Sequence, residues 1–312
     1  MVCFLYERAS ALFSFIHESL LPSNIYNSKT LMRITVIPFA HSLTLDPYTY
    51  SVPDMWHTSI CLGGLVEIPF GNNIDTGIIT GIDGEIPQGF DPESIKPIHQ
   101  VIASIELISL SQISMILAIA HRYFIPLYRV LKMFLPTPLL SRLDKKNYLL
   151  DICAVSTKNE KNHREKSIIH YRDRAFFRED LASLIHPGSV IIFPDDFFLY
   201  TMTDQLSSEI TICPAEATSV RKSKFWIDAY EGRAKIIVWT RRLLYYNLAR
   251  YDHLYYIEDA FWDEDYQYPT RLRNLDILRI LTDQSQLNIS IISSTPTLEL
   301  FAHFRDFSII TR

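Results

Sequence analysis

The segment SVIIFPD, residues 189–195, is a short apolar run of the kind that forms a buried β-strand. Three similar runs follow it, and helix-like stretches lie between the runs. Apolar strands that alternate with helices predict a parallel sheet that is covered on both faces, so the fold class expected is α/β. The further strands are AKIIVWT (234–240), HLYYIED (253–259) and LNISIISST (287–295), and the helix-like stretches are FFREDLASLI (176–185), SVRKSKFWIDAYEG (219–232) and RLRNLDILRILTDQ (271–284).

Upstream of this region, residues 33–102 are β-rich. The strand-like runs ITVIPF (34–39), LVEIPF (65–70) and TGIITGI (76–82) are separated by turn residues, and seven of the nine glycines lie between Gly63 and Gly89. This pattern predicts a small barrel or sandwich with tight turns.

A helical tail follows the β-rich region. Apolar residues recur at helical spacing over residues 109–135. Ser109 or Ser111 is suited to cap the first helix, and Pro126 is expected to break the run into two helices.

The sequence therefore predicts four segments. Residues 1–31 are interpreted as an N-terminal extension, and residues 32–140 as a small β-rich domain with a helical tail. Residues 141–166 are polar and predict a linker, and residues 167–312 form the α/β lobe.

Composition limits the possible functions. The 312 residues are 48% hydrophobic and 21% charged, which is typical of a globular protein with a real core. The net charge of −5 taken alone favours a protein that does not bind nucleic acid, so any DNA contact must use local patches. The four cysteines include no CxxC pair, and the ten histidines lack ligand spacing, so no metal site is predicted. Scattered thiols, no signal peptide and no membrane span lead us to expect a cytoplasmic protein.

Three motifs of the first half resemble a known family. YTYSVP (48–53), GGLVEIPFG (63–71) and AHRYFIPLYRVLKMFLP (120–136) keep the order and spacing of motifs in the 3′-DNA-end-binding domain of PriA-type replication-restart helicases. The resemblance implies DNA as a partner, single-stranded or branched, bound at a 3′ end. It carries the family's DNA-holding residues over to Tyr48, Thr49, Gly71 and Lys96. The family has an aspartate at the position of Thr49, and a hydroxyl accepts a hydrogen bond from a 3′-hydroxyl more weakly than a carboxylate does.

The second half resembles the first RecA-like lobe of the same helicases. GRAKIIVWTRR (232–242) is similar to the segment that lies along single-stranded DNA in the family, which implies DNA contacts for Thr240 and Arg241. GSVIIFPDDFFLYTMTDQL (188–206) and ISIISSTPTLELF (289–301) are similar to two further helicase motifs.

The nucleotide site of that lobe is not found in the sequence. A phosphate-binding loop needs glycines and a lysine between a strand and a helix, and the corresponding residues here are YRDR (171–174). The Asp-Glu-x-His box is also absent, because the strand there continues as HLYYIEDAFWDEDYQYP (253–269). We expect no ATP binding, no other cofactor and no catalytic residue, and we expect the chain to lack the family's second lobe. The acidic residues 258–265 fit a solvated turn better than a magnesium site.

Two basic sets lie near aromatic residues. These sets are Arg221 to Lys224, and Arg122 with Arg129 and Lys132. Each set is either a track for a phosphate backbone or ordinary solvated helix surface, and the second interpretation is favoured.

Three functions remain open. The favoured hypothesis is a DNA-binding protein of replication restart that has lost ATP binding and helicase activity, with helicase-loading proteins as further partners. The alternatives are an ATP-dependent 3′–5′ helicase completed by a missing second lobe, and a module of the primosome that binds only proteins. A titration with single-stranded, 3′-overhang and forked DNA separates the first from the last.

Overall fold

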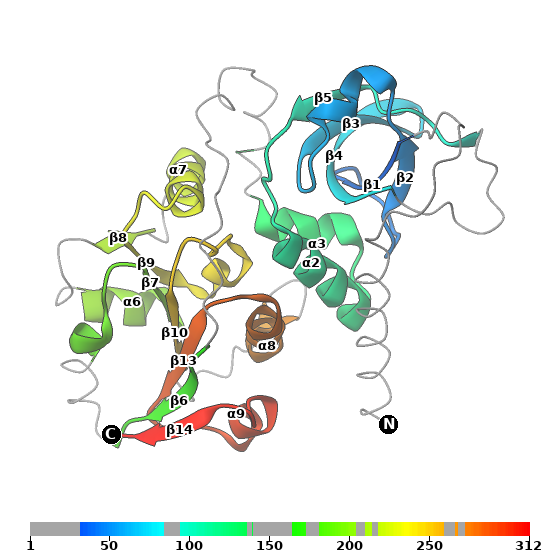
Figure 1. Cartoon of the computed structure of the whole chain (residues 1–312). Coiled ribbons are helices and arrows are strands. Elements are labelled where there is room, and N and C mark those ends of the chain that lie inside the picture. The colour runs from blue at the N-terminus through cyan, green and yellow to red at the C-terminus, as the bar shows by residue number, and fades with distance from the viewer. Residues whose placement is uncertain are drawn as a thin grey trace. The chain divides into compact units, whose positions relative to one another are not determined.

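A five-stranded antiparallel sheet forms the first part of the computed structural model (Figure 1). The structure describes residues 32–83, 94–135, 139, 164–172, 181–203, 210–213, 218–258, 266–267 and 272–312. The strands lie in the order β2-β1-β4-β3-β5. Their bounds are β1 Arg33–Pro38, β2 Tyr48–Ser51, β3 Leu65–Phe70, β4 Asn73–Ile82 and β5 Gln100–Ala103, and the 3₁₀ helix η1 spans Asp54–Ser59.

The segment that leads into β5 closes this sheet into a barrel. The backbone N–H of Ser51 at the end of β2 donates to the carbonyl of Lys96 (3.0 Å), and the N–H of Ile98 donates to the carbonyl of Ser51 (3.0 Å). The N–H of His99 donates to the carbonyl of Glu67 on β3 (2.8 Å). The segment that leads into β5, at one edge of the sheet, thus bonds to β2, at the other edge. The small barrel expected from the sequence is confirmed over its sandwich alternative.

Apolar side chains fill the interior of the barrel. Each strand of the barrel buries one face, so alternate residues along it point into the interior. In the runs of Ile and Val, these inward positions carry apolar side chains. The buried cluster consists of Ile34, Val36, Tyr50, Val52, Val66, Ile68, Ile79 and Ile98.

Two helices follow the barrel, as the apolar spacing predicts. Helix α2 spans Leu110–Tyr123 and begins with a capping box between Ser109 and Gln112. It ends at Phe124, which has a left-handed backbone (φ 52°), and Pro126 starts α3, which spans Leu127–Phe134. At Gly63 (φ 72°), a Cβ would lie 1.9 Å from the carbonyl oxygen of Ile108, so glycine permits the close approach of the barrel to the start of α2.

A seven-stranded parallel sheet forms the rest of the described chain, in the order β14-β6-β13-β10-β7-β9-β8. This confirms the α/β class predicted from the alternating pattern. The strands are β6 Lys166–His170, β7 Ser189–Phe193, β8 Ile210–Ile212, β9 Ile236–Thr240, β10 His253–Glu258, β13 Asn288–Ser293 and β14 Ser308–Thr311. The helices are α6 Asp196–Thr203, α7 Ser219–Tyr230, η3 Arg241–Tyr245, α8 Asn274–Gln284 and α9 Leu298–His303, and β11 Tyr266–Gln267 pairs with β12 Leu272–Arg273.

Both faces of this sheet are covered. All five residues of β7 are buried, and they alternate between two apolar clusters: Ile191 and Phe193 belong to one, Val190 and Ile192 to the other. Buried parallel strands have this continuous apolar sequence because helices pack on both sides.

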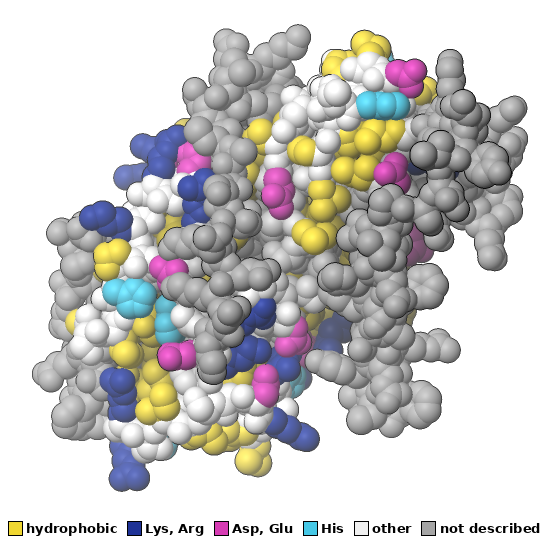
Figure 2. Space-filling model, in the orientation of Figure 1, with side chains coloured by type: hydrophobic (Ala, Val, Ile, Leu, Met, Phe, Trp, Pro, Cys, Tyr) yellow, Lys and Arg dark blue, Asp and Glu magenta, His cyan; other side chains and the backbone are white. Residues whose placement is uncertain are grey.

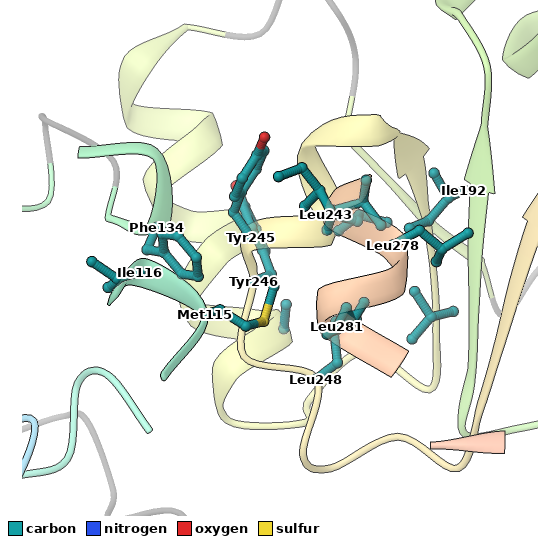
Figure 3. Packing of buried hydrophobic residues seen from close by; sticks show 14 of the residues in the cluster. Met115, Ile116, Phe134, Ile192, Leu243, Tyr245, Tyr246, Leu248, Leu278 and Leu281 are labelled. Atoms are coloured by element: carbon teal, nitrogen blue, oxygen red, sulfur yellow. The ribbon is translucent and has the colours of Figure 1, made fainter. Parts of the chain in front are cut away.

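The second of these clusters also contains the helical tail of the barrel. Figure 3 shows Met115, Ile116 and Phe134 of α2 and α3 facing Tyr245 of the lobe. The rings of Phe134 and Tyr245 meet edge to face, with centroids 5.3 Å apart. The indole N–H of Trp226 on α7 donates to the carbonyl oxygen of Phe134 (3.1 Å). The helical tail and the lobe therefore share one hydrophobic core.

A polar cluster around the buried Asp276 of α8 joins the same two regions. The Tyr123 hydroxyl donates to one carboxylate oxygen, and Arg122 donates to the other at 2.7 Å. His303 of α9 places its Nε2 atom 3.1 Å from the oxygen that Arg122 contacts. Desolvation alone would raise the pKa of Asp276. The hydrogen bonds to its carboxylate and the nearby cation of Arg122 outweigh that effect, so the pKa of Asp276 is lowered from its ordinary value.

Several boundaries differ from those expected, among them the starts of α8 and β6. Helix α8 begins at Asn274 rather than Arg271, because Leu272 and Arg273 pair with β11. Strand β6 begins at Lys166, the last residue assigned to the linker. The expected extension 1–31, residues 141–163 of the linker and most of the helix expected over 176–185 lie outside the described residues.

Candidate DNA-binding site

Tyr48 lies half-buried at the start of β2 and contacts a second aromatic residue. Its ring meets the ring of Phe70, at the end of β3, edge to face with centroids 5.3 Å apart. Its hydroxyl forms a hydrogen bond with the Ser42 hydroxyl (2.9 Å). These two contacts fix the ring, so the aromatic face that is required for base stacking is held in place.

Gly71 follows Phe70 directly and forms the β3–β4 hairpin with Asn72. Phe70 pairs with Asn73 across this two-residue turn, and Gly71 has φ 61°, as the first central residue of a type II′ turn requires. A Cβ at Gly71 would meet nothing within 4 Å. The turn is open, so a phosphate or sugar can approach the backbone there.

Thr49 and Lys96 are placed differently. Thr49 pairs with Thr35 of β1, and strand alternation directs its side chain to the opposite face from Tyr48 and Tyr50. Lys96 is exposed, and its carbonyl is bound to Ser51, three residues along β2 from Tyr48. The structure therefore brings Tyr48 and Gly71 together through Phe70, with Lys96 at the other end of the same strand.

Sequence reasoning missed Phe70 and Asp75. The Asp75 carboxylate accepts a hydrogen bond from the N–H of Ala40. Burial raises the pKa of Tyr50 to about 12, and the nearby Tyr48 and Asp75 add to the rise. Asp75 is thus an acid close to Tyr50 of β2, although the strand itself carries Thr49. The only sequence signal was a polar residue within the strand run NIDTGIITGI.

Thr240 and Arg241 lie on the other sheet. Thr240 ends β9, beside Phe193 at the end of β7, and Arg241 begins η3. Burial raises the pKa of Cys213, just after β8, to about 12, while the cations Lys222 and Arg242 act against the rise. Basic side chains therefore gather at the carboxyl ends of β8 and β9, and Figure 2 shows Lys and Arg side chains over α7.

Several expected features fall outside the described residues. Among them are Asp173 and Arg174 of the YRDR segment and residues 259–265 of the acidic cluster. Across the described ranges, no group of three or more His, Cys, Asp or Glu residues is placed to hold a metal ion. The helices in those ranges are too short or too polar to cross a membrane.

Comparison with known proteins finds a similarity that is confined to the barrel and its helical tail. A sequence model of the 3′DNA-binding domain (3′BD) of PriA matches residues 36–136. The replication restart protein PriA of Synechocystis sp. is 33% identical over 99 residues. That match covers 32% of this chain and 12% of the relative, so the chain spans only a small part of the relative's length.

The solved structures compared are more distant. The C-terminal domain of the DEAD-box protein Dbp5 aligns over 47% of this chain and 89% of its own, with a TM-score of 0.35 and 12% identity. Dbp5 of S. cerevisiae bound to Gle1 and IP6 aligns over 55% of this chain and 46% of its own, with a TM-score of 0.38 and 10% identity. Those scores carry no assignment. The sequence comparisons show that residues 36–136 are similar to the 3′DNA-binding domain of PriA.

Proposed function

We propose that this chain is a DNA-binding protein of replication restart whose barrel receives the 3′ end of a DNA strand. The observation that carries the proposal is the contact of Tyr48 with Phe70 beside the open Gly71 turn, within the segment that matches the PriA 3′DNA-binding domain. The terminal base stacks on the Tyr48–Phe70 pair, and the backbone of the turn contacts the sugar or phosphate. Lys96 supplies a charge for the phosphate backbone.

The proposed site prefers a free 3′-hydroxyl over a 3′-phosphate. We expect this preference to be weaker than it would be if β2 carried a carboxylate at position 49. Thr49 is a poor acceptor, and strand alternation directs it away from the Tyr48 ring. The finer parts of the proposal are a cytoplasmic location, which the scattered thiols support, and helicase-loading proteins as partners, which the family resemblance implies.

Tyr48→Ala is expected to weaken binding of a single-stranded oligonucleotide by about 1–3 kcal/mol, because it removes the stacking surface. Fluorescence anisotropy with 3′-hydroxyl and 3′-phosphate oligonucleotides measures the loss. Tyr48→Phe keeps the ring and should bind nearly as the parent does, and Tyr200→Ala removes a half-exposed tyrosine of the lobe as a matched control. Equal affinity of Tyr48→Ala and the parent would show that no base stacks there. A parent that binds no DNA would favour the protein-interaction alternative.

We further propose that the lobe neither binds nor hydrolyses ATP. The support is the YRDR sequence, which lacks the glycines and the lysine of a phosphate-binding loop. Isothermal titration with magnesium-ATP is expected to give no saturable binding below a dissociation constant of about 100 μM. Tighter binding, or ATPase activity that DNA stimulates, would instead support the helicase alternative.

A further inference from the structure

Two exposed cations of α3 surround one buried aromatic ring. The Arg129 guanidinium carbon lies 5.8 Å from the ring centroid of Tyr128, and the Lys132 Nζ atom lies 5.1 Å from it. The Nε atom of Arg129 also donates to the Tyr128 hydroxyl (2.9 Å). The exposed His41, from the β1–β2 connection, places its ring 4.8 Å from the same ring. The aromatic ring holds both cationic side chains close to the helix, so little side-chain entropy remains for a ligand to remove.

The charges of Arg129 and Lys132 are not neutralised by the described acids. Among the residues that the structure describes, neither side chain forms an ion pair, and the acid of the neighbouring connection, Asp46, lies 3.9 Å from His121 instead. Arg122 is different, because it is bound to Asp276. The basic set that the sequence grouped together is therefore split, and only its α3 members are available to an anion.

A short series of contacts connects this pair with Tyr48. The Tyr48 hydroxyl contacts Ser42, which follows His41 in the chain, and the His41 ring contacts Tyr128. The backbone N–H of Leu127, at the start of α3, donates to the carbonyl of Thr44 (3.2 Å). The β1–β2 connection thus joins the base-stacking site to the basic pair. At roughly 3.4 Å of axial rise per nucleotide, a few nucleotides cover such a span.

We propose that Arg129 and Lys132 bind the phosphodiester backbone of the strand whose 3′ end reaches Tyr48. This inference rests on the proposed function and adds a second, sequence-independent contact several nucleotides upstream of the 3′ end. Cations that neutralise phosphates release counterions. For single strands, each such contact steepens the slope of log affinity against log salt concentration by roughly 0.7.

The test uses the full chain with Arg129→Glu/Lys132→Glu, and Arg129→Gln/Lys132→Gln as a milder pair. We expect the first to weaken binding of an oligothymidylate of about 12 nucleotides on the order of tenfold at low salt, and to flatten the salt slope by roughly 1.4 units. The glutamine pair should show a smaller loss in the same direction. With an oligothymidylate of about 2 nucleotides, which is too short to contact both sites, the differences should shrink. Melting temperatures close to that of the parent confirm that the variants are folded.

Arg164→Glu/Arg305→Glu makes the same change of charge at two exposed arginines, one just before β6 and one after α9, and is the matched control. An unchanged salt slope in both α3 pairs, with Tyr48→Ala still impaired, overturns the inference and leaves the proposed function standing. An equal loss in the lobe control also overturns it, because only net charge would then matter. If the parent binds no DNA, both proposals fail.

Discussion

Trp226→Ala is expected to lower the free energy of unfolding by about 3–5 kcal/mol. Trp226 is 1% exposed and stacks on Tyr230 with ring centroids 5.1 Å apart. Its removal leaves a large cavity where α7 meets the helical tail of the barrel. It also leaves the carbonyl of Phe134, which accepts the indole hydrogen bond, without that donor.

Urea unfolding followed by circular dichroism measures this loss. Trp226→Phe keeps most of the volume and should cost clearly less than the alanine. Phe124→Ala removes a ring that is 80% exposed and should change stability by less than about 0.5 kcal/mol. If Trp226→Ala were as stable as Phe124→Ala, the shared core between tail and lobe would not exist in solution.

Asp276→Ala is expected to cost about 1–3 kcal/mol near neutral pH, since it leaves the part-buried Tyr123 hydroxyl without its acceptor. The side chain of Asp276 is 8% exposed, and its loss leaves the Tyr123 hydroxyl without its acceptor, whereas Arg122 is 53% exposed and can be hydrated. Asp276→Asn keeps the shape and one acceptor oxygen, so it should cost less than the alanine.

The cost of Asp276→Asn should depend on pH. Because the folded protein holds the pKa of Asp276 below its ordinary value, the carboxylate stabilises the fold fully above that ordinary value. The contribution is lost as the pH falls through the folded pKa. The difference in unfolding free energy between parent and Asp276→Asn should therefore be large at neutral pH and shrink in acid. Asp54→Asn, whose parent side chain is 91% exposed, serves as control. A difference that grows in acid would contradict the assignment.

The regular elements were predictable because their signals are local. The apolar runs of β7, β9, β10 and β13 are continuous, which is typical of strands buried on both faces. Ser109 and Pro126 mark the limits of the two tail helices in the sequence. The boundary of α8 was missed because the pairing of Leu272 with β11 is not a local property.

The candidate site was predictable only in part. Tyr48 and Gly71 came from the family resemblance, but their contact through Phe70 depends on the curvature of the closed barrel. The sequence also grouped Arg122 with Arg129, although Arg122 is bound to an aspartate more than 150 positions later. Contacts between such distant residues leave no periodic signal in a single sequence.

The shared core of tail and lobe also determines when the protein can finish folding during synthesis. Met115 and Phe134 leave the ribosome long before Tyr245, which they face in the finished core. At about 5–20 residues per second, this delay is on the order of ten seconds. During that interval the barrel can be complete while the apolar face of its helical tail has no partner. A chaperone that binds nascent chains therefore has a defined apolar target, which disappears once the lobe has been made.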